Sequence, residues 1–219
     1  MKLQKIFAEF LGTALLLLAV IGSGIMATNL TKDEGIQLTI NAISIVSMLY
    51  LIITLFGPIS GAHFNPAVSL VMYATKNLSL KETLAYIPAQ IGGAIVGALL
   101  ANLTFDLPVL QFSGHARVTT GTLVAEVIAT AGLLAVIQVF AARKDASHVA
   151  IAVAAWIGSA YFFTASTSFA NPAVTIGRAF TDTFAGIAPA SIVPFIAAQL
   201  VGAALGLLIA KALTSTQAD

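Results

Sequence analysis

Two copies of the tripeptide Asn-Pro-Ala are the residues of this chain best suited to binding chemistry. They consist of Asn65, Pro66, Ala67, Asn171, Pro172 and Ala173. Asparagine is a preferred helix N-cap, and proline fits the first turn of a helix, where its missing N–H is no loss. Each copy therefore predicts a helix start, whose backbone N–H groups and asparagine amide are hydrogen-bond donors. Both starts lie inside long apolar runs, where free donors are tolerated only beside a cavity, so we expect the two copies to line one.

The overall composition is that of a membrane protein. Of the 219 residues, 58% are hydrophobic and 9% are charged, against about 25% charged in ordinary soluble domains. The net charge of +1 gives no reason to expect nucleic acid as a partner, and the absence of cysteine excludes disulfides and thiolate metal sites. His63 lacks partners for a metal site, so we expect no metal and no cofactor.

Intervals without charged residues predict the membrane spans. Residues 10–31, 83–105 and 183–210 each allow one span of ~20 residues, and 127–142 make another when extended back to Thr119. The intervals 35–75 and 146–177 are longer and each contains an Asn-Pro-Ala, so each fits one span plus a half-span. We therefore expect an all-α membrane protein with re-entrant half-helices beginning at Pro66 and Pro172, and with six transmembrane helices at roughly 5–27, 36–57, 83–103, 119–142, 148–166 and 188–211. We interpret the first span as a retained helix, since no signal-peptide cleavage site stands out.

The basic residues set the expected orientation, because Lys and Arg accumulate in cytoplasmic loops. With the N-terminus inside, the cytoplasmic basic residues are Lys2, Lys5, Lys76, Lys81, Arg143, Lys144 and Lys211. Those outside are Lys32, Arg117 and Arg178. We therefore expect a multi-pass protein of the inner (plasma) membrane, surrounded by the lipid bilayer, with both termini cytoplasmic.

Three short sequence motifs occur twice in the chain, in the same order. The run EFLGT from Glu9 matches EVIAT from Glu126, the two Asn-Pro-Ala-Val runs match each other, and QIGGAIVG from Gln90 matches QLVGAALG from Gln199. We expect one domain, 1–219, with repeat one at about 1–104 and repeat two at about 118–213. Three spans per repeat is an odd number, so the second repeat must be inverted, which places a site near the midplane where the half-helix starts meet.

Two Asn-Pro-Ala motifs, six spans and paired glutamates together resemble the major intrinsic protein family, the aquaporins and aquaglyceroporins. The resemblance covers Glu9 to Gly206 and implies a six-helix bundle, half-helices that meet beside a pore, and one pore in each subunit of a homotetramer. It also implies that Asn65 and Asn171 present amides to passing solutes, although as isolated motifs both would be simple helix caps. Each half-helix start carries roughly half a positive charge, and the facing pair excludes cations and protons, as already described for aquaporin-type pores.

Glu9 and Glu126 are carboxylates within predicted spans, and two roles fit them. In an ion-coupled transporter they would carry protons or sodium ions. In the family pattern they instead accept hydrogen bonds from the non-helical backbone that leads into the half-helices. No basic residue accompanies either glutamate near the middle of its span, and the two recur at symmetric places. We therefore favour the structural role of buried acids.

The resemblance also implies where the pore is narrowest. Most members of the family follow the second Asn-Pro-Ala with an arginine, and this chain has Val174 there. Counting without gaps places the other filter positions at Ile45, Ser159 and Ser168. A one-residue insertion before the second motif would shift the last two to Gly158 and Thr167. In either register the filter lacks the aromatic, histidine and arginine of water-selective members, so we expect it to be wide.

Arg178 follows Val174 by four residues and therefore lies on the same face, one turn further along the half-helix. Two interpretations fit. The guanidinium reaches the outer vestibule and restores part of the missing charge, or it snorkels to the membrane surface.

An arginine-free filter resembles that of a bacterial branch of the family associated with arsenic resistance. The resemblance implies a passive channel for small uncharged solutes, namely metalloid acids such as arsenite, methylated arsenicals and glycerol, together with water. An ordinary water or glycerol channel is the alternative within the family, and an ion-coupled secondary transporter is the alternative from another class. No set of nucleophile, base and orienting residue is visible, so we do not expect an enzyme.

Overall fold

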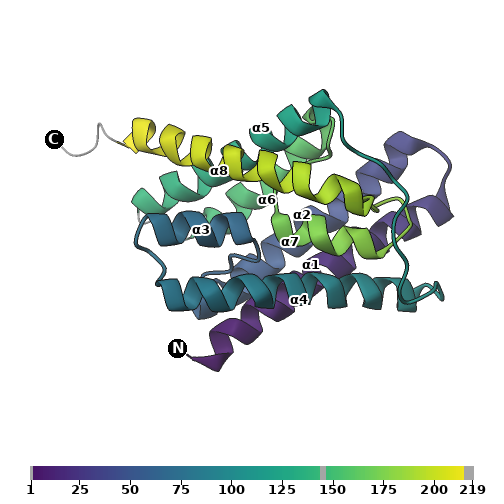
Figure 1. Cartoon of the computed structure of the whole chain (residues 1–219), viewed down its shortest axis with the longest axis horizontal. Coiled ribbons are helices and arrows are strands. Elements are labelled where there is room, and N and C mark those ends of the chain that lie inside the picture. Colours follow the sequence, from purple (N-terminus) through teal and green to yellow (C-terminus); the bar gives the residue numbers. More distant parts are fainter. Residues whose placement is uncertain (1, 144–146, 215–219) are drawn as a thin grey trace.

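The computed structural model describes residues 2–143 and 147–214. Within these residues the regular structure is entirely helical, so the all-α prediction is confirmed. Its elements, shown in Figure 1, are α1 (Leu3–Leu30), α2 (Glu34–Ser60), α3 (Pro66–Ala74), α4 (Leu80–Thr104), α5 (Thr120–Ala142), α6 (Val149–Phe163), α7 (Pro172–Gly177), the 3-10 turns η1 (Arg178–Phe180) and η2 (Pro189–Ser191), and α8 (Ile192–Thr214).

Five of these helices, α1, α2, α4, α5 and α8, are long and apolar enough to cross a membrane. They occupy predicted spans, and α2 and α4 begin earlier than expected because polar residues beside the apolar runs cap them. The Ile36 N–H donates to Asp33 Oδ1 at 2.9 Å at the start of α2, and Ser79 and Glu82 form a capping box at the start of α4. The sixth span, α6, is shorter than predicted at 15 residues, or ~22 Å. It ends early because the backbone becomes extended at Thr164 and turns back toward α7.

Glycines bring two pairs of helices into close contact. α1 packs along α4, and α5 packs along α8. A Cβ added at Gly93 or Gly97 of α4 would lie 2.2 Å from a backbone oxygen of α1, and one added at Gly206 of α8 would lie 2.3 Å from the Ala131 oxygen of α5. Side chains larger than hydrogen are therefore excluded at these crossings, as is usual where membrane helices approach closely.

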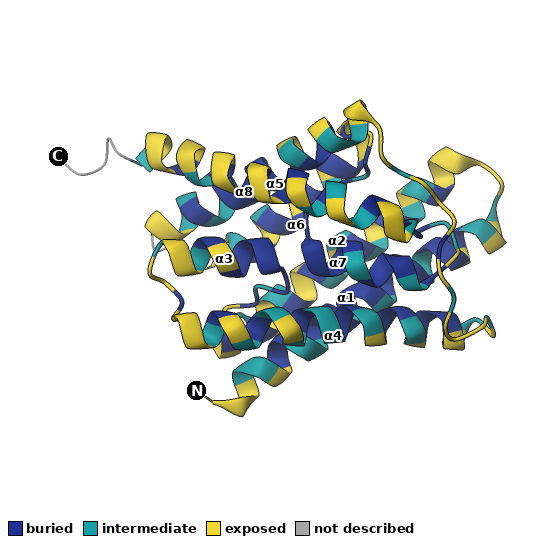
Figure 2. Ribbon diagram, in the orientation of Figure 1, coloured by how far each residue is buried: buried dark blue, intermediate teal, exposed yellow. Residues whose placement is uncertain are grey.

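The half-helices α3 and α7 begin near the middle of the molecule and run toward opposite ends (Figure 1). The residues at their starts are buried, whereas the far turn of α3 is exposed (Figure 2). The start of α1 and the end of α8 lie at the same end of the molecule (Figure 1). The free N–H groups of both half-helices therefore face the interior of the bundle, which is where the Asn-Pro pattern predicts them.

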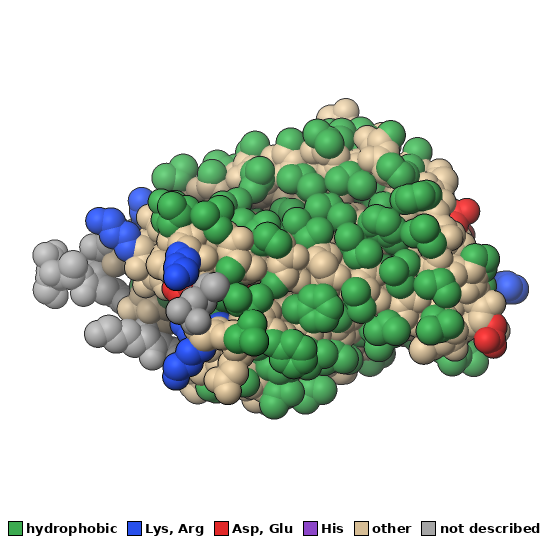
Figure 3. All heavy atoms as spheres, turned by 60° about the horizontal axis from the view of Figure 1, so that its bottom comes forward, with side chains coloured by type: hydrophobic (Ala, Val, Ile, Leu, Met, Phe, Trp, Pro, Cys, Tyr) green, Lys and Arg blue, Asp and Glu red, His purple; other side chains and the backbone are tan. Residues whose placement is uncertain are grey.

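Large hydrophobic side chains cover the outside of the bundle. Ile43, Leu84 and Val193, on three different helices, are all more than half exposed. In Figure 3 such side chains form a belt around the middle of the visible face, and the charged side chains lie at the two ends. Most of the basic side chains visible there gather at the end that carries both termini. Lys144, one of the predicted cytoplasmic residues, lies outside the described residues. An apolar belt between charged ends matches the cross-section of a bilayer.

Candidate functional site

The two Asn-Pro-Ala motifs meet at the middle of the molecule and are joined by their asparagine side chains. Asn65 Nδ2 donates to the Ala170 carbonyl at 2.8 Å, and Asn171 Nδ2 donates to the Phe64 carbonyl at 2.8 Å. The Oδ1 atom of each also accepts from the backbone N–H two residues further on, at 2.9 Å, and so caps its half-helix. An amide NH2 group has two N–H bonds, so one N–H of each asparagine is left over for a solute.

The segments leading into α3 and α7 have an unusual backbone. Positive φ angles occur at Gly61, Ala62, Phe64, Thr167, Ser168 and Ala170. Left-handed conformations are costly for residues that carry a Cβ, so surrounding contacts must hold them. Gly12 of α1 provides space for one of these contacts, because a Cβ added there would lie 2.1 Å from the Phe64 ring.

Glu9 holds the first of these segments. The backbone N–H of His63 donates to Glu9 Oε1 at 3.0 Å, and that of Phe64 donates to Oε2 at 2.7 Å. Ser60 Oγ donates to Oε1 at 2.6 Å, and Gln90 Nε2 of α4 donates to Oε2 at 2.8 Å. The carboxylate is fully buried and accepts four hydrogen bonds, two at each oxygen.

Glu126 holds the second segment in the same way. The backbone N–H groups of Phe169 and Ala170 donate to its two oxygens, each at 2.9 Å. Gln199 of α8 donates to Glu126 Oε2 at 2.6 Å and to Thr175 Oγ1 at 2.8 Å. This carboxylate is also fully buried, and neither it nor Glu9 is among the residues that line the cavity between the half-helices. These contacts favour the structural role over that of an ion carrier.

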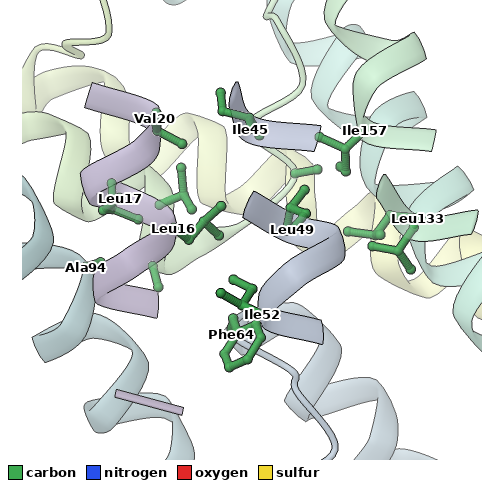
Figure 4. Packing of buried hydrophobic residues seen from close by; sticks show 14 of the residues in the cluster. Leu16, Leu17, Val20, Ile45, Leu49, Ile52, Phe64, Ala94, Leu133 and Ile157 are labelled. Carbon is green, nitrogen blue, oxygen red and sulfur yellow. The ribbon is translucent and has the colours of Figure 1, made fainter. Parts of the chain in front are cut away.

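A cavity of about 110 Å³ runs past the meeting point of α3 and α7. Its polar side is formed by the two non-helical segments, from Gly61 to Asn65 and from Ser168 to Asn171, and by Arg178. Its apolar side is formed by side chains of α1, α2, α5 and α6, several of which converge on one space in Figure 4. They are Leu16, Val20, Ile45, Leu49, Ile53, Leu133, Ile137, Val149, Val153 and Ile157. One wall therefore offers hydrogen-bond donors and acceptors, and the opposite wall is aliphatic and offers none. This arrangement suits a small polar solute that moves along the polar wall.

The cavity includes three of the four predicted filter residues. Ile45, Ser168 and Val174 line it, but Ser159 is exposed and faces away. The prediction for Ser159 is wrong because it lies two residues, or about 200° of helix, beyond the cavity-lining Ile157. The one-residue shift does not correct this, since Gly158 packs against α2, where a Cβ would lie 2.5 Å from Val46.

Tyr161 is a cavity residue that the counting from the asparagines missed. The lining residues of α6 recur every four positions, at Val149, Val153, Ile157 and Tyr161. This is the spacing of one helix face, so the signal was present in the sequence. Tyr161 is buried in the protein and lines the cavity. The cavity therefore contains an aromatic residue that the predicted filter lacks.

Arg178 lies in the cavity wall one turn beyond Val174, where α7 ends and η1 begins. Its side chain is 3% exposed, so the interpretation as a snorkelling residue is wrong. The guanidinium carbon sits 3.5 Å from the centroid of the Phe169 ring, and Nε donates to the Ala185 carbonyl. A buried arginine fixed by an aromatic face and a carbonyl is a rigid donor.

His63 lines the cavity on the α3 side, and its Nδ1 is 3.0 Å from Ser69 Oγ. Within residues 2–143 and 147–214, no group of three or more His, Cys, Asp or Glu side chains is placed to bind a metal ion. The chemistry available along the cavity is therefore hydrogen bonding by amides, hydroxyls, carbonyls, the imidazole of His63 and the guanidinium of Arg178.

Comparison with known proteins gives consistent matches. The family model described as Major intrinsic protein matches residues 1–165. An aquaglyceroporin, AqpS of Rhizobium meliloti (strain 1021), is 45% identical over 208 residues, covering 95% of this chain and 89% of the relative. Aquaporin NIP3-1 of Arabidopsis thaliana is 33% identical over 191 residues, covering 80% of this chain and 58% of the relative. The fold resembles the X-ray structure of the aquaglyceroporin from Plasmodium falciparum, with a TM-score of 0.74 at 21% identity, covering 97% of both chains.

Proposed function

The chain belongs to the major intrinsic protein family of membrane channels, and we propose that it conducts water, glycerol and neutral metalloid acids passively. The observation that carries the proposal is the cavity that passes both asparagine amides, with aliphatic side chains opposite them. A solute that leaves water loses hydrogen bonds, which are costly to leave unmade. The polar wall replaces them on one side only, so solutes with hydroxyl groups on one face fit best.

Val174 is the residue that supports metalloid acids as solutes. This residue lines the cavity directly after the second Asn-Pro-Ala, where most members of the family have arginine. Valine is shorter and carries no donor, so it leaves more room beside Asn171 for a solute wider than water. Arsenite in its neutral acid form and methylated arsenicals have hydroxyl groups and a compact shape, as glycerol does. The relative from Rhizobium meliloti is itself named an aquaglyceroporin, which supports a solute range beyond water.

The setting in the membrane is part of the same proposal. Both described ends of the chain lie at one end of the bundle, and most of the visible basic side chains gather there (Figures 1 and 3). Because cytoplasmic loops are enriched in Lys and Arg, this end faces the cytoplasm of an inner (plasma) membrane. The structure contains a cavity within a single subunit, so a homotetramer would hold one pathway in each subunit.

Stopped-flow light scattering of proteoliposomes tests the proposal. Vesicles containing the protein are challenged with sucrose, glycerol and arsenite gradients in turn. We expect faster shrinkage than in empty vesicles with sucrose, followed by re-swelling when glycerol or arsenite enters. Water flow without re-swelling would limit the channel to water. The same vesicles containing Asn171→Leu serve as a control, since that variant loses the amide, the cap and the contact with Phe64.

A further inference from the structure

We propose that Arg178 and Tyr161 form the selective constriction of this channel, one helical turn outside the position that Val174 occupies. The inference rests on the proposed channel function and names the residues that decide which solutes pass. Val174 carries no donor, but Arg178 and Tyr161 line the same cavity. Compared with the usual family arrangement, the aromatic residue and the arginine of this chain therefore both lie further from the asparagines, toward the outer end of the cavity.

The position of Arg178 follows from the length of α7. This helix has six residues and ends at Gly177, so the next residue starts a 3-10 turn while keeping the face of Val174. The Phe169 ring at 3.5 Å and the Ala185 carbonyl hold the guanidinium in place. Nη1 has no hydrogen-bond partner within the described residues. A buried donor of this kind is satisfied when a solute oxygen reaches it.

The charge of this constriction is not neutralised by the chain. Arg117 lies on the same aromatic ring, 5.6 Å from the Phe169 centroid, and donates to the carbonyls of Gly186 and Phe184 at 2.6 and 2.9 Å. In the part of the chain that the structure describes, neither arginine has a carboxylate within 4.0 Å. The Arg178 guanidinium, which lines the cavity, therefore gives its outer end a positive charge that repels cations before they reach the half-helix starts.

Hydroxyl groups complete the constriction. Tyr161 and Ser168 both line the cavity, and Ser168 Oγ is buried without a hydrogen-bond partner within residues 2–143 and 147–214. A hydroxyl both donates and accepts, so it can bind an O–H group of a solute while the guanidinium binds another oxygen of that solute. The constriction therefore favours neutral polyhydroxy solutes, which are the polyols and the protonated oxyacids, over apolar solutes of equal size.

Three substitutions at Arg178 separate its donors from its charge. Arg178→Met keeps the length of the stem and removes both properties. Arg178→Gln keeps donors and removes the charge, and Arg178→Lys keeps the charge. For the methionine variant we expect the glycerol-to-water permeability ratio to fall about tenfold, equivalent to about 1.4 kcal/mol, together with a measurable potassium leak. We expect glutamine to preserve most of the ratio but to leak potassium, and lysine to keep the leak low.

Arg117→Gln is the matched control, because Arg117 contacts the same ring and the same loop but does not line the cavity. We expect it to leave the glycerol-to-water ratio unchanged. Tyr161→Phe should lower the ratio in the same direction as Arg178→Met, since it removes only the hydroxyl. Each value is normalised to folded protein measured by size-exclusion chromatography, and each variant must still conduct water.

The outcomes distinguish this inference from the function on which it rests. Wild-type vesicles that conduct neither water nor glycerol would refute the channel itself. Wild-type conduction combined with an unchanged ratio and no potassium leak in Arg178→Met would refute only the constriction. A fall in the glycerol-to-water ratio of Arg117→Gln as large as that in Arg178→Met would also refute it, because the effect would then arise from the loop at 184–186.

Discussion

Replacing Glu9 with leucine tests the central physical claim, that a buried carboxylate holds the strained backbone before α3. Leucine has a similar volume but no acceptor. The backbone N–H groups of His63 and Phe64, which donate to Glu9 at 3.0 and 2.7 Å, would then be buried without partners. Neither can turn to water, because the side chain that they face is fully buried.

The expected loss in the free energy of unfolding follows from these two backbone N–H groups. An orphaned buried donor costs about 1–3 kcal/mol, so the pair costs about 2–6 kcal/mol. The Gln90 amide is left out of this sum because it also donates to Ser69 at 2.9 Å. The destabilisation by Glu9→Gln should lie between zero and that of Glu9→Leu, at about 1–3 kcal/mol. Each carboxylate oxygen serves one of the two backbone donors, and an amide keeps only one oxygen.

Unfolding of the purified protein in a titration with denaturing detergent measures these differences. The order of midpoints should be wild type, then Glu9→Gln, then Glu9→Leu. Glu126→Leu should resemble Glu9→Leu, because Glu126 also accepts two backbone N–H groups. Glu34→Leu is the control, since Glu34 is exposed in the first turn of α2. A wild-type midpoint for Glu9→Leu would show that the carboxylate does not hold the segment. Normal stability combined with lost flux would instead make Glu9 an ion carrier.

Three further predictions concern transport, selectivity and packing. Solute flux should be the same with and without an imposed proton gradient or membrane potential, because neither buried glutamate lines the cavity; accumulation against a solute gradient in proteoliposomes would contradict this. Val174→Arg should reduce glycerol flux more than water flux, and Val174→Leu should reduce both less; equal glycerol-to-water ratios in all three proteins would remove Val174 from the selective region. Gly97→Ala should lower the midpoint of detergent unfolding strongly, since its Cβ would lie 2.2 Å from the Ala14 oxygen. Gly57→Ala should leave the midpoint unchanged, since a Cβ there would have no atom within 4 Å. Similar midpoints for the two alanine variants would contradict the close helix crossing.

The sequence by itself determined the helices and the two half-helix starts. Charge-free intervals limit where a chain can cross a bilayer, and an Asn-Pro pair leaves few alternatives to a capped helix start. The pairing of Glu9 with the segment before Asn65 was anticipated only through the resemblance to the family, in whose pattern the buried glutamates accept hydrogen bonds from this backbone. The predictions of the helices and half-helix starts succeeded where local chemistry allows one solution.

Only the tertiary structure decided which side chains face the solute. Ser159 and Tyr161 belong to one helix, and their roles depend on the rotation of α6 about its axis, which is set by packing against α2 and α5. Counting from Asn171 could not give that rotation, since the intervening segment contains three residues with positive φ. The position of the Arg178 charge was also decided by the tertiary structure and not by the local sequence. A lone arginine near a membrane end normally reaches water, but here the Phe169 ring and the Ala185 carbonyl offer it a buried site. That site exists only after the loop has folded back over α7.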